Sequence, residues 1–151
     1  MTEVAFHFNV GDTARDKLQY ACRLIRKAHA TGARLGVVGP DDTVRELDRM
    51  LWTFSPLEFI PHCRVDDPTA TPAVRARTPV VLGAAAAHVA PAEVLLNLAE
   101  TIPEGLEAFG RVIEIVSQQD DDRQAARQRW RAYTQGGFAI TQHDIAARGP
   151  A

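Results

Sequence analysis

The chain has 151 residues, of which 46% are hydrophobic and 24% charged, values typical of one soluble globular domain with a buried core. Its formal net charge of -2 excludes a strong overall attraction to DNA or to an anionic membrane, so any contact with nucleic acid has to be local or indirect. The longest weakly polar run, residues 80–90, is too short to cross a bilayer and contains His88.

Strands and helices are expected to alternate along the first part of the chain. Residues 4–10 alternate strictly, which predicts a half-buried strand whose inner face carries Val4, Phe6, Phe8 and Val10. Apolar residues at helical spacing then predict a helix over 18–28 that ends at Gly32. We next expect a buried strand at 35–39, a helix over 41–52 with a capping box of Thr43 and Glu46, and a short strand at 59–62.

The second half predicts one long loop, three strands and a final helix. Residues 64–79 hold three prolines and have no apolar period, which indicates a surface loop. Strands are expected within 79–83, 94–99 and 111–116, with a short helical piece at 105–109. The final helix should start near Asp120–Asp122 and stop at Gly136–Gly137, and residues 143–151 are expected to form a flexible tail.

This order predicts a single α/β domain over residues 1–142, a Rossmann-like sheet, parallel or mixed, with helices on both faces. The stretch after the first strand, NVGDTARDK, has one glycine where a dinucleotide fingerprint needs three. The sequence also lacks a Walker lysine motif, a zinc-ligand pattern and a G-x-S-x-G elbow. We therefore expect no catalytic residue, metal or cofactor, although a small nucleotide-dependent enzyme on the same scaffold stays open as an alternative.

Two further features concern the cellular compartment. The first residues, MTEVAFHFNVGD, lack the basic and long apolar regions of a signal peptide. Cys22 and Cys63 are too far apart in the sequence for a paired-cysteine motif and are expected to be free thiols in a reducing environment. A cytoplasmic protein is expected.

The segment 127–138, RQRWRAYTQGGF, concentrates cationic and aromatic side chains before a Gly-Gly break. On a helix, Arg123, Arg127, Trp130 and Arg131 fall at i, i+4, i+7 and i+8, so they share one face that carries no carboxylate. A solvated face is the simplest interpretation, but such faces usually mix both signs of charge. Arginine binds carboxylates in two-point fashion and aromatic rings bury apolar groups, so we interpret this face as a receptor for an acidic ligand with an apolar end.

A second candidate surface lies within residues 47–62, LDRMLWTFSPLEFIPH. It holds Trp52, Phe54 and Phe59 close to Pro56 and Pro61. Core packing is one interpretation of these rings. The prolines, however, place part of the stretch in loops, where aromatic side chains often anchor interfaces.

The blocks ELDRMLW…FIPH and RQRWRAYTQGGF together resemble the chi subunit family of bacterial DNA polymerase III, and the resemblance runs from the FHFNV strand to the GGF segment. It implies a non-catalytic accessory subunit of the clamp-loader complex, located in the cytoplasm at the replisome. It implies two partners, the acidic C-terminal tail of single-stranded DNA-binding protein, which ends in Pro-Phe, and the psi subunit or another clamp-loader subunit. Contact with DNA is then mainly indirect, and no membrane is involved.

By position, the resemblance assigns the tail site to Arg123, Arg127, Trp130, Arg131, Tyr133 and Gly137. It assigns the surface for psi or the clamp loader to Trp52 and Phe59. Trp130 and Arg123 stand where some relatives have tyrosine and lysine, and residues 64–79 match no pattern of the family. Direct binding of single-stranded nucleic acid through the arginine helix remains a second alternative.

Overall fold

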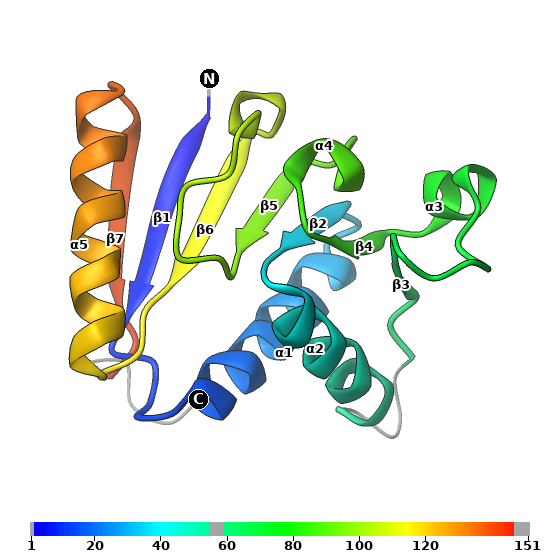
Figure 1. Cartoon of the computed structure of the whole chain (residues 1–151), viewed down its shortest axis with the longest axis horizontal. Coiled ribbons are helices and arrows are strands. Elements are labelled where there is room, and N and C mark those ends of the chain that lie inside the picture. The colour runs from blue at the N-terminus through cyan, green and yellow to red at the C-terminus, as the bar shows by residue number, and fades with distance from the viewer. Residues whose placement is uncertain (1, 55–58, 147–151) are drawn as a thin grey trace.

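The computed structural model describes residues 2–54 and 59–146. In chain order its elements are β1 Glu3–Phe8, α1 Ala14–Ala30, β2 Leu35–Val38, α2 Asp41–Thr53, β3 His62–Arg64, α3 Pro72–Arg77, β4 Val80–Gly83, α4 Ala86–Val89, β5 Val94–Asn97, the 3-10 helix η1 Leu106–Ala108, β6 Arg111–Ile115, α5 Asp120–Gln135 and β7 Ala139–Asp144. The strands form one sheet in the order β3-β4-β2-β5-β6-β1-β7, and every pairing is parallel (Figure 1). The predicted Rossmann-like α/β fold is confirmed, with a wholly parallel sheet.

Helices cover both faces of this sheet, and each face has its own hydrophobic cluster. Ile25 of α1 and Leu47 of α2 pack on one face. Phe6 of β1 packs with Ala126 and Tyr133 of α5 on the other face. Strand β1 lies between β6 and β7, and even its small Ala5 is buried, so β1 is covered on both sides rather than half-buried.

The first strand ends earlier than its alternation predicts. Asn9 has a φ of 59° and leaves the strand after Phe8. Val10 therefore joins the cluster under α1 and α2, whereas Phe6 and Phe8 contact the cluster under α5. The prediction that Val10 shares a face with Phe6 and Phe8 is wrong, because the turn at Asn9 redirects the chain.

The expected capping box of α2 does not form. The helix begins at Asp41, with Pro40 at the N-cap and no hydrogen bond from a capping side chain. Two aspartates occupy the first turn, where a negative charge is favoured by the helix dipole. Because the helix starts at Asp41, Thr43 already lies inside it and cannot act as the cap.

The segment 64–79 contains more regular structure than a loop. Its middle forms the short helix α3, where the Thr71 hydroxyl accepts a hydrogen bond from the Val74 N–H and Pro72 occupies the first turn. The strand expected at 59–62 starts only at His62 and continues to Arg64. The remaining expected strands, the short helical piece before β6 and the final helix are confirmed.

The turn after α5 leads into a strand that the sequence did not predict. Gly137 has a φ of 79°, the Phe138 N–H donates to the Tyr133 carbonyl at 3.1 Å, and the two rings meet edge to face with centroids 5.9 Å apart. The chain then forms β7, which pairs with β1 along its whole length. His143 and Asp144 therefore belong to the sheet rather than to the expected tail, of which residues 147–151 lie outside the described residues.

Candidate functional site

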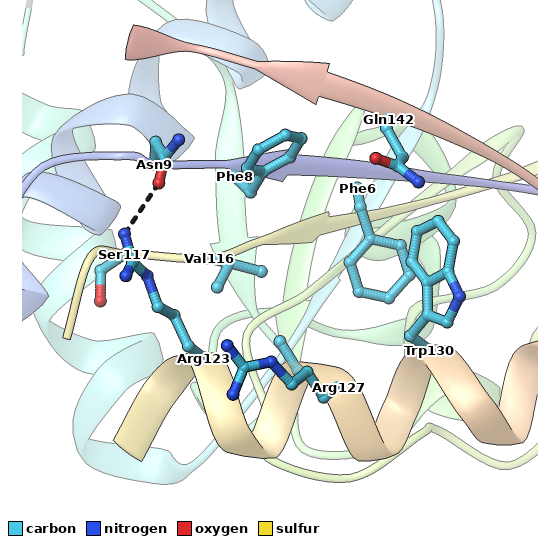
Figure 2. Close-up of a pocket in the computed structure, with 10 residues that line it drawn as sticks. Phe6, Phe8, Asn9, Val116, Ser117, Arg123, Arg127, Trp130 and Gln142 are labelled. Carbon is cyan, nitrogen blue, oxygen red and sulfur yellow. Dashed lines mark hydrogen bonds between the residues drawn. The ribbon is translucent and has the colours of Figure 1, made fainter. Parts of the chain in front are cut away.

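A groove of about 410 Å³ lies between α5 and the part of the sheet formed by β1, β6 and β7 (Figure 2). We call it the α5 groove, and define it by the residues that line it, which are Phe6, Phe8, Asn9, Val116, Ser117, Arg123, Ala126, Arg127, Trp130 and Gln142. The strands contribute the floor from their carboxyl-terminal halves, and the helix contributes one wall. Ligands of open α/β sheets commonly bind at this edge.

The floor of the groove is apolar. The Phe6 ring lies 5.0 Å from the Trp130 ring, measured between centroids, and is itself only 4% exposed. Val116 is buried beside it, and Phe8 is partly exposed. Tyr133 supports Phe6 from below, with ring centroids 5.9 Å apart in an edge-to-face arrangement. The floor can therefore bury an apolar group that enters from solvent.

Two guanidinium groups stand over this floor (Figure 2). Arg123 Nη2 donates to Asn9 Oδ1 at 3.0 Å, so the side chain is held in place by a neutral group. Arg127 is exposed, and within residues 2–54 and 59–146 neither arginine forms an ion pair with a carboxylate. No acidic residue lines the groove among the described residues. Among the described residues, the site thus combines an apolar floor with two arginines that form no ion pair, and the nearest carboxylate linked to them, that of Asp144, is reached only through Asn9.

The acidic first turn of α5 is partly neutralised. Asp122 Oδ2 accepts hydrogen bonds from the Ser117 N–H at 2.8 Å and its hydroxyl at 2.9 Å, and lies 3.0 Å from Lys17 Nζ. Burial alone raises the pKa of Asp122, but the bonds from Ser117 and the charge of Lys17 outweigh burial and lower it. This carboxylate is therefore ionised and paired with a cation of α1 at neutral pH.

A buried polar network beneath α5 fixes the helix on the sheet. Glu114 of β6 is fully buried and accepts hydrogen bonds from Arg129 Nε at 3.0 Å, the Tyr133 hydroxyl at 2.7 Å and Asn97 Nδ2 at 2.9 Å. Arg129 Nη1 also donates to the Glu100 carbonyl at 3.0 Å. Burial raises the pKa of Glu114, although Arg129 and the two neutral donors oppose that shift.

The structure brings together only part of the predicted tail site. Arg123, Arg127 and Trp130 line the groove, whereas Arg131 is exposed and lies outside its lining. Tyr133 is buried beneath the floor, and Gly137 forms the turn after the helix. Sequence reasoning missed the strand-side residues, which are Phe6, Phe8, Asn9, Val116, Ser117 and Gln142. The signal that could have found them is the parallel pairing of β1 and β6, because it brings the carboxyl ends of both strands to the same edge of the sheet.

The second candidate surface is exposed. Trp52 is 58% and Phe59 is 62% exposed, and their rings lie 5.4 Å apart between centroids. The Trp52 ring also lies 4.8 Å from the ring of buried His62. Phe54 is instead partly buried against the core, and Pro56 lies outside the described residues. We call Trp52 and Phe59 the aromatic surface; adjacent exposed rings of this size are typical of an interface.

The turn between β1 and α1, where a Rossmann fold commonly binds phosphate, contains a carboxylate of the protein itself. Asp16 Oδ2 accepts from the N–H of Asp12 at 2.9 Å and of Thr13 at 3.2 Å, and the Thr13 hydroxyl accepts from the Asp16 N–H, which completes a capping box. Gly11 packs against the Asp16 side chain with a φ of 64°, so a larger residue would not fit there. The carboxylate occupies N–H donors that a phosphate would need and repels a phosphate.

Two other features are not found among the described residues. Among residues 2–54 and 59–146, no three histidine, cysteine, aspartate or glutamate side chains gather in a way that could hold a metal ion. No described helix is long and apolar enough to span a membrane.

Comparison with known proteins gives a consistent picture. A family model described as "DNA polymerase III chi subunit, HolC" matches residues 1–141. DNA polymerase III subunit chi of Pseudomonas aeruginosa is 33% identical over 146 residues, which cover 96% of this chain and 98% of the relative. The proteins of the same name from Escherichia coli and Haemophilus influenzae are 26% identical over 146 residues and 23% identical over 129 residues. The alignment with the Escherichia coli protein covers 93% of this chain and 96% of that protein, and the alignment with the Haemophilus influenzae protein covers 84% of this chain and 86% of that protein.

Proposed function

Because the chain belongs to the DNA polymerase III chi subunit family, we propose that it is a non-catalytic accessory subunit that links single-stranded DNA-binding protein to the clamp loader. It binds the acidic C-terminal tail of that protein in the α5 groove and works in the cytoplasm at the replisome. The observation that supports this proposal most directly is that one groove combines an apolar floor with two guanidinium groups that form no ion pair with any described residue. A tail that is acidic and ends in phenylalanine has the complementary chemistry.

The groove suggests how such a tail lies. The terminal carboxylate and a neighbouring aspartate pair with Arg123 and Arg127, since arginine forms short charge-assisted hydrogen bonds with carboxylates. The phenylalanine ring enters between Trp130 and the floor residues Phe8 and Val116. A volume of about 410 Å³ suits the last few residues of a peptide rather than a long segment.

The other residues of the predicted tail site have indirect roles in this proposal. Tyr133 supports Phe6 from within the core. Gly137 permits the turn that places β7, and with it Gln142, beside β1. Arg131 lies on the outer side of α5 and contributes mainly to the long-range positive field.

The aromatic surface supports a second interaction, with psi or another clamp-loader subunit. Trp52 and Phe59 lie on α2 and just before β3, far along the sheet from the α5 groove. Their position allows both partners to bind at once. Binding two partners at separate surfaces is what a linking subunit requires.

Titration of a fluorescent peptide that ends in Asp-Ile-Pro-Phe tests the proposal. The wild type should bind saturably, and Arg127→Ala and Trp130→Ala should both bind more weakly. Gln128→Ala is the matched control, because Gln128 is exposed on α5 but does not line the groove. Absence of binding to the wild type would refute the function, and equal affinities for all four proteins would place the tail site elsewhere.

A further inference from the structure

A second cationic cavity lies on the same face of the sheet as the α5 groove, but toward the opposite edge, near β4. It has a volume of about 370 Å³ and is formed by α3, α4 and β4, which Figure 1 shows far from α5 and β7. We call it the α3–α4 cavity. Its polar lining residues are Arg34, Arg75 and His88, and its walls include Val65, Val81 and Val89.

The two arginines are half-buried and are held by backbone carbonyls. Arg75 Nη1 donates to the Ala70 carbonyl at 2.6 Å, and Arg34 Nη2 donates to the Arg75 carbonyl at 3.4 Å. These neutral acceptors orient the guanidinium groups but do not cancel their charge. Within the described part of the chain, neither arginine forms an ion pair with a carboxylate.

A nearby acidic residue is already engaged. Glu93 Oε2 accepts a hydrogen bond from the backbone N–H of Arg34 at 2.7 Å, and Glu93 does not line the cavity. Arg45 and Arg49 of α2 differ in this respect, because each pairs with a carboxylate on the surface. Glu93 keeps its negative charge, but because it does not line the cavity, Arg34 and Arg75 are the charged side chains of the described lining that a bound anion meets.

The walls restrict the kind of anion. The described lining contains no phenylalanine, tyrosine or tryptophan, so nucleic-acid bases have no stacking platform of the usual kind. A bare phosphate ion would leave the exposed apolar lining, which includes Pro72, Ala87 and Pro91, in contact with water. A carboxylate carried on a small aliphatic group uses both the guanidinium groups and the walls.

We propose that the α3–α4 cavity is a second anion site, and that it binds a carboxylate attached to a small aliphatic group. Arg34 and Arg75 bind the carboxylate, His88 donates from the rim, and Val65, Ala87 and Pro91 contact the aliphatic part. The ligand is either a free short carboxylic acid or the C-terminal residue of a peptide. This site is independent of the function proposed for the α5 groove.

NMR titration of the ¹⁵N-labelled full chain tests the proposal, because it reports each site separately. The probes are isovalerate, N-acetyl-leucine, a tripeptide N-acetyl-Gly-Ala-Leu, the uncharged N-acetyl-leucinamide and inorganic phosphate. The acids should shift the amides of Arg75, Ala76, His88 and Val89 saturably. The uncharged amide should bind at least about tenfold more weakly, since charge-assisted hydrogen bonds are lost.

Variants complete the test. Arg75→Gln should weaken acid binding about tenfold, and Arg75→Lys, which keeps the charge but not the fork, should fall between it and the wild type. Arg77→Gln is the matched control, because Arg77 is an exposed arginine of the same helix outside the cavity lining. Stronger binding of the tripeptide than of isovalerate identifies a peptide terminus as the ligand, and the reverse order identifies a free acid.

Three outcomes would overturn the proposal. The first is no shift at the cavity with any acid. The second is equal affinity for the acid and its amide, which would mean that the site does not recognise the carboxylate, or equal affinity for N-acetyl-leucine and phosphate, which would mean that it does not recognise the aliphatic group. The third is an Arg75→Gln protein that retains a dispersed spectrum and binds the acids as the wild type does.

Discussion

Arg129 of α5 and Glu114 of β6 form a buried ion pair, with Nε 3.0 Å from Oε1, and this pair sets the rotation of α5 on the sheet. At about 100° per residue, Arg123, Arg127 and Trp130 then lie roughly 100–160° around the helix from Arg129, on the side that faces the groove. Arg131 lies at roughly 200°, on the outer side. The orientation of the helix face that lines the α5 groove is thus fixed by residues that do not belong to it.

Removing Arg129 should destabilise the protein strongly. Arg129→Ala leaves the Glu114 carboxylate buried without its cation, and breaking such a pair typically costs about 3–5 kcal/mol of unfolding free energy. The midpoint and slope of urea unfolding give this value. Arg127→Ala, at an exposed position, should change stability by less than about 0.5 kcal/mol and serves as the control.

The defect of Arg129→Ala should depend on pH in a defined direction. Burial raises the pKa of Glu114 above its ordinary value of 4.5, so the native state binds a proton at a higher pH than the unfolded state does. The charge of Arg129 opposes this rise, so Arg129→Ala should raise the pKa of Glu114 further. The contribution of Glu114 to stability should therefore increase more steeply in the variant than in the wild type as the pH falls from 7 toward 4.5, because the protonated carboxyl tolerates burial. The gap to the wild type should narrow over this range; a gap that widens would contradict this account of Glu114.

Arg127 and Arg131 should differ in tail binding although both are exposed arginines on α5. Arg127→Ala removes a charge-assisted hydrogen bond at the groove and should lower the affinity about tenfold or more. Arg131→Ala removes a charge outside the lining and should lower it less than about threefold, mainly through the screened field. Isothermal or fluorescence titration at one salt concentration separates the two. The reverse ranking would move the site to the outer face of α5.

Salt and the last phenylalanine should affect tail binding separately. Raising the ionic strength screens the pairs with Arg123 and Arg127 and should weaken binding of the intact peptide. Deleting the terminal phenylalanine should reduce affinity at every salt concentration, because contact with Trp130 and the floor is apolar. Titrations of both peptides between low and high salt measure the two effects. A loss on deletion that vanishes at high salt would argue against an apolar pocket for the ring.

Phe59→Ala should impair assembly with clamp-loader subunits without impairing folding of the chain. Phe59 is 62% exposed, so truncation should leave the thermal midpoint nearly unchanged. Truncating a central interface aromatic often costs about 2 kcal/mol or more of binding, so co-purification with clamp-loader subunits should fall sharply. Tail affinity should stay at the wild-type value. Unfolding of Phe59→Ala would instead assign Phe59 to the core.

The sequence predicted most of the sheet because buried parallel strands read as short apolar runs. Strand β7 was missed since the edge strand is polar along much of its length and does not show a buried run. The sequence predicts a capping box for α2 at Thr43 and Glu46, which does not form. A capping box that it does not predict forms instead in α1, between Thr13 and Asp16, with aspartate in place of the usual glutamate or glutamine. Local patterns identify the elements, but the start of a helix depends on competing side chains.

The candidate site was predicted only from the helix. Ala126, Arg129 and Tyr133 fall at i, i+3 and i+7, which is the spacing of a buried stripe, and all three are buried. Arg129 makes this stripe hard to recognise in the sequence, because arginine is rarely buried without a partner. Its partner is Glu114 of the preceding strand β6, and the sequence alone does not show that the two side chains meet. The family resemblance assigns Tyr133 to the tail site, whereas the structure buries it beneath the groove. The floor residues depend on which strands are neighbours, and that order comes from the tertiary structure.

The groove joins the first strand of the chain to its last helix and last strand. Phe6 and Trp130 meet in space although more than a hundred residues separate them along the chain. During synthesis, β1 leaves the ribosome long before α5 and β7 have been made, so in the partial chain Phe6 and Phe8 are not yet covered by these two elements. The α5 groove should therefore become able to bind a ligand late and in one step, once α5 and β7 have left the exit tunnel.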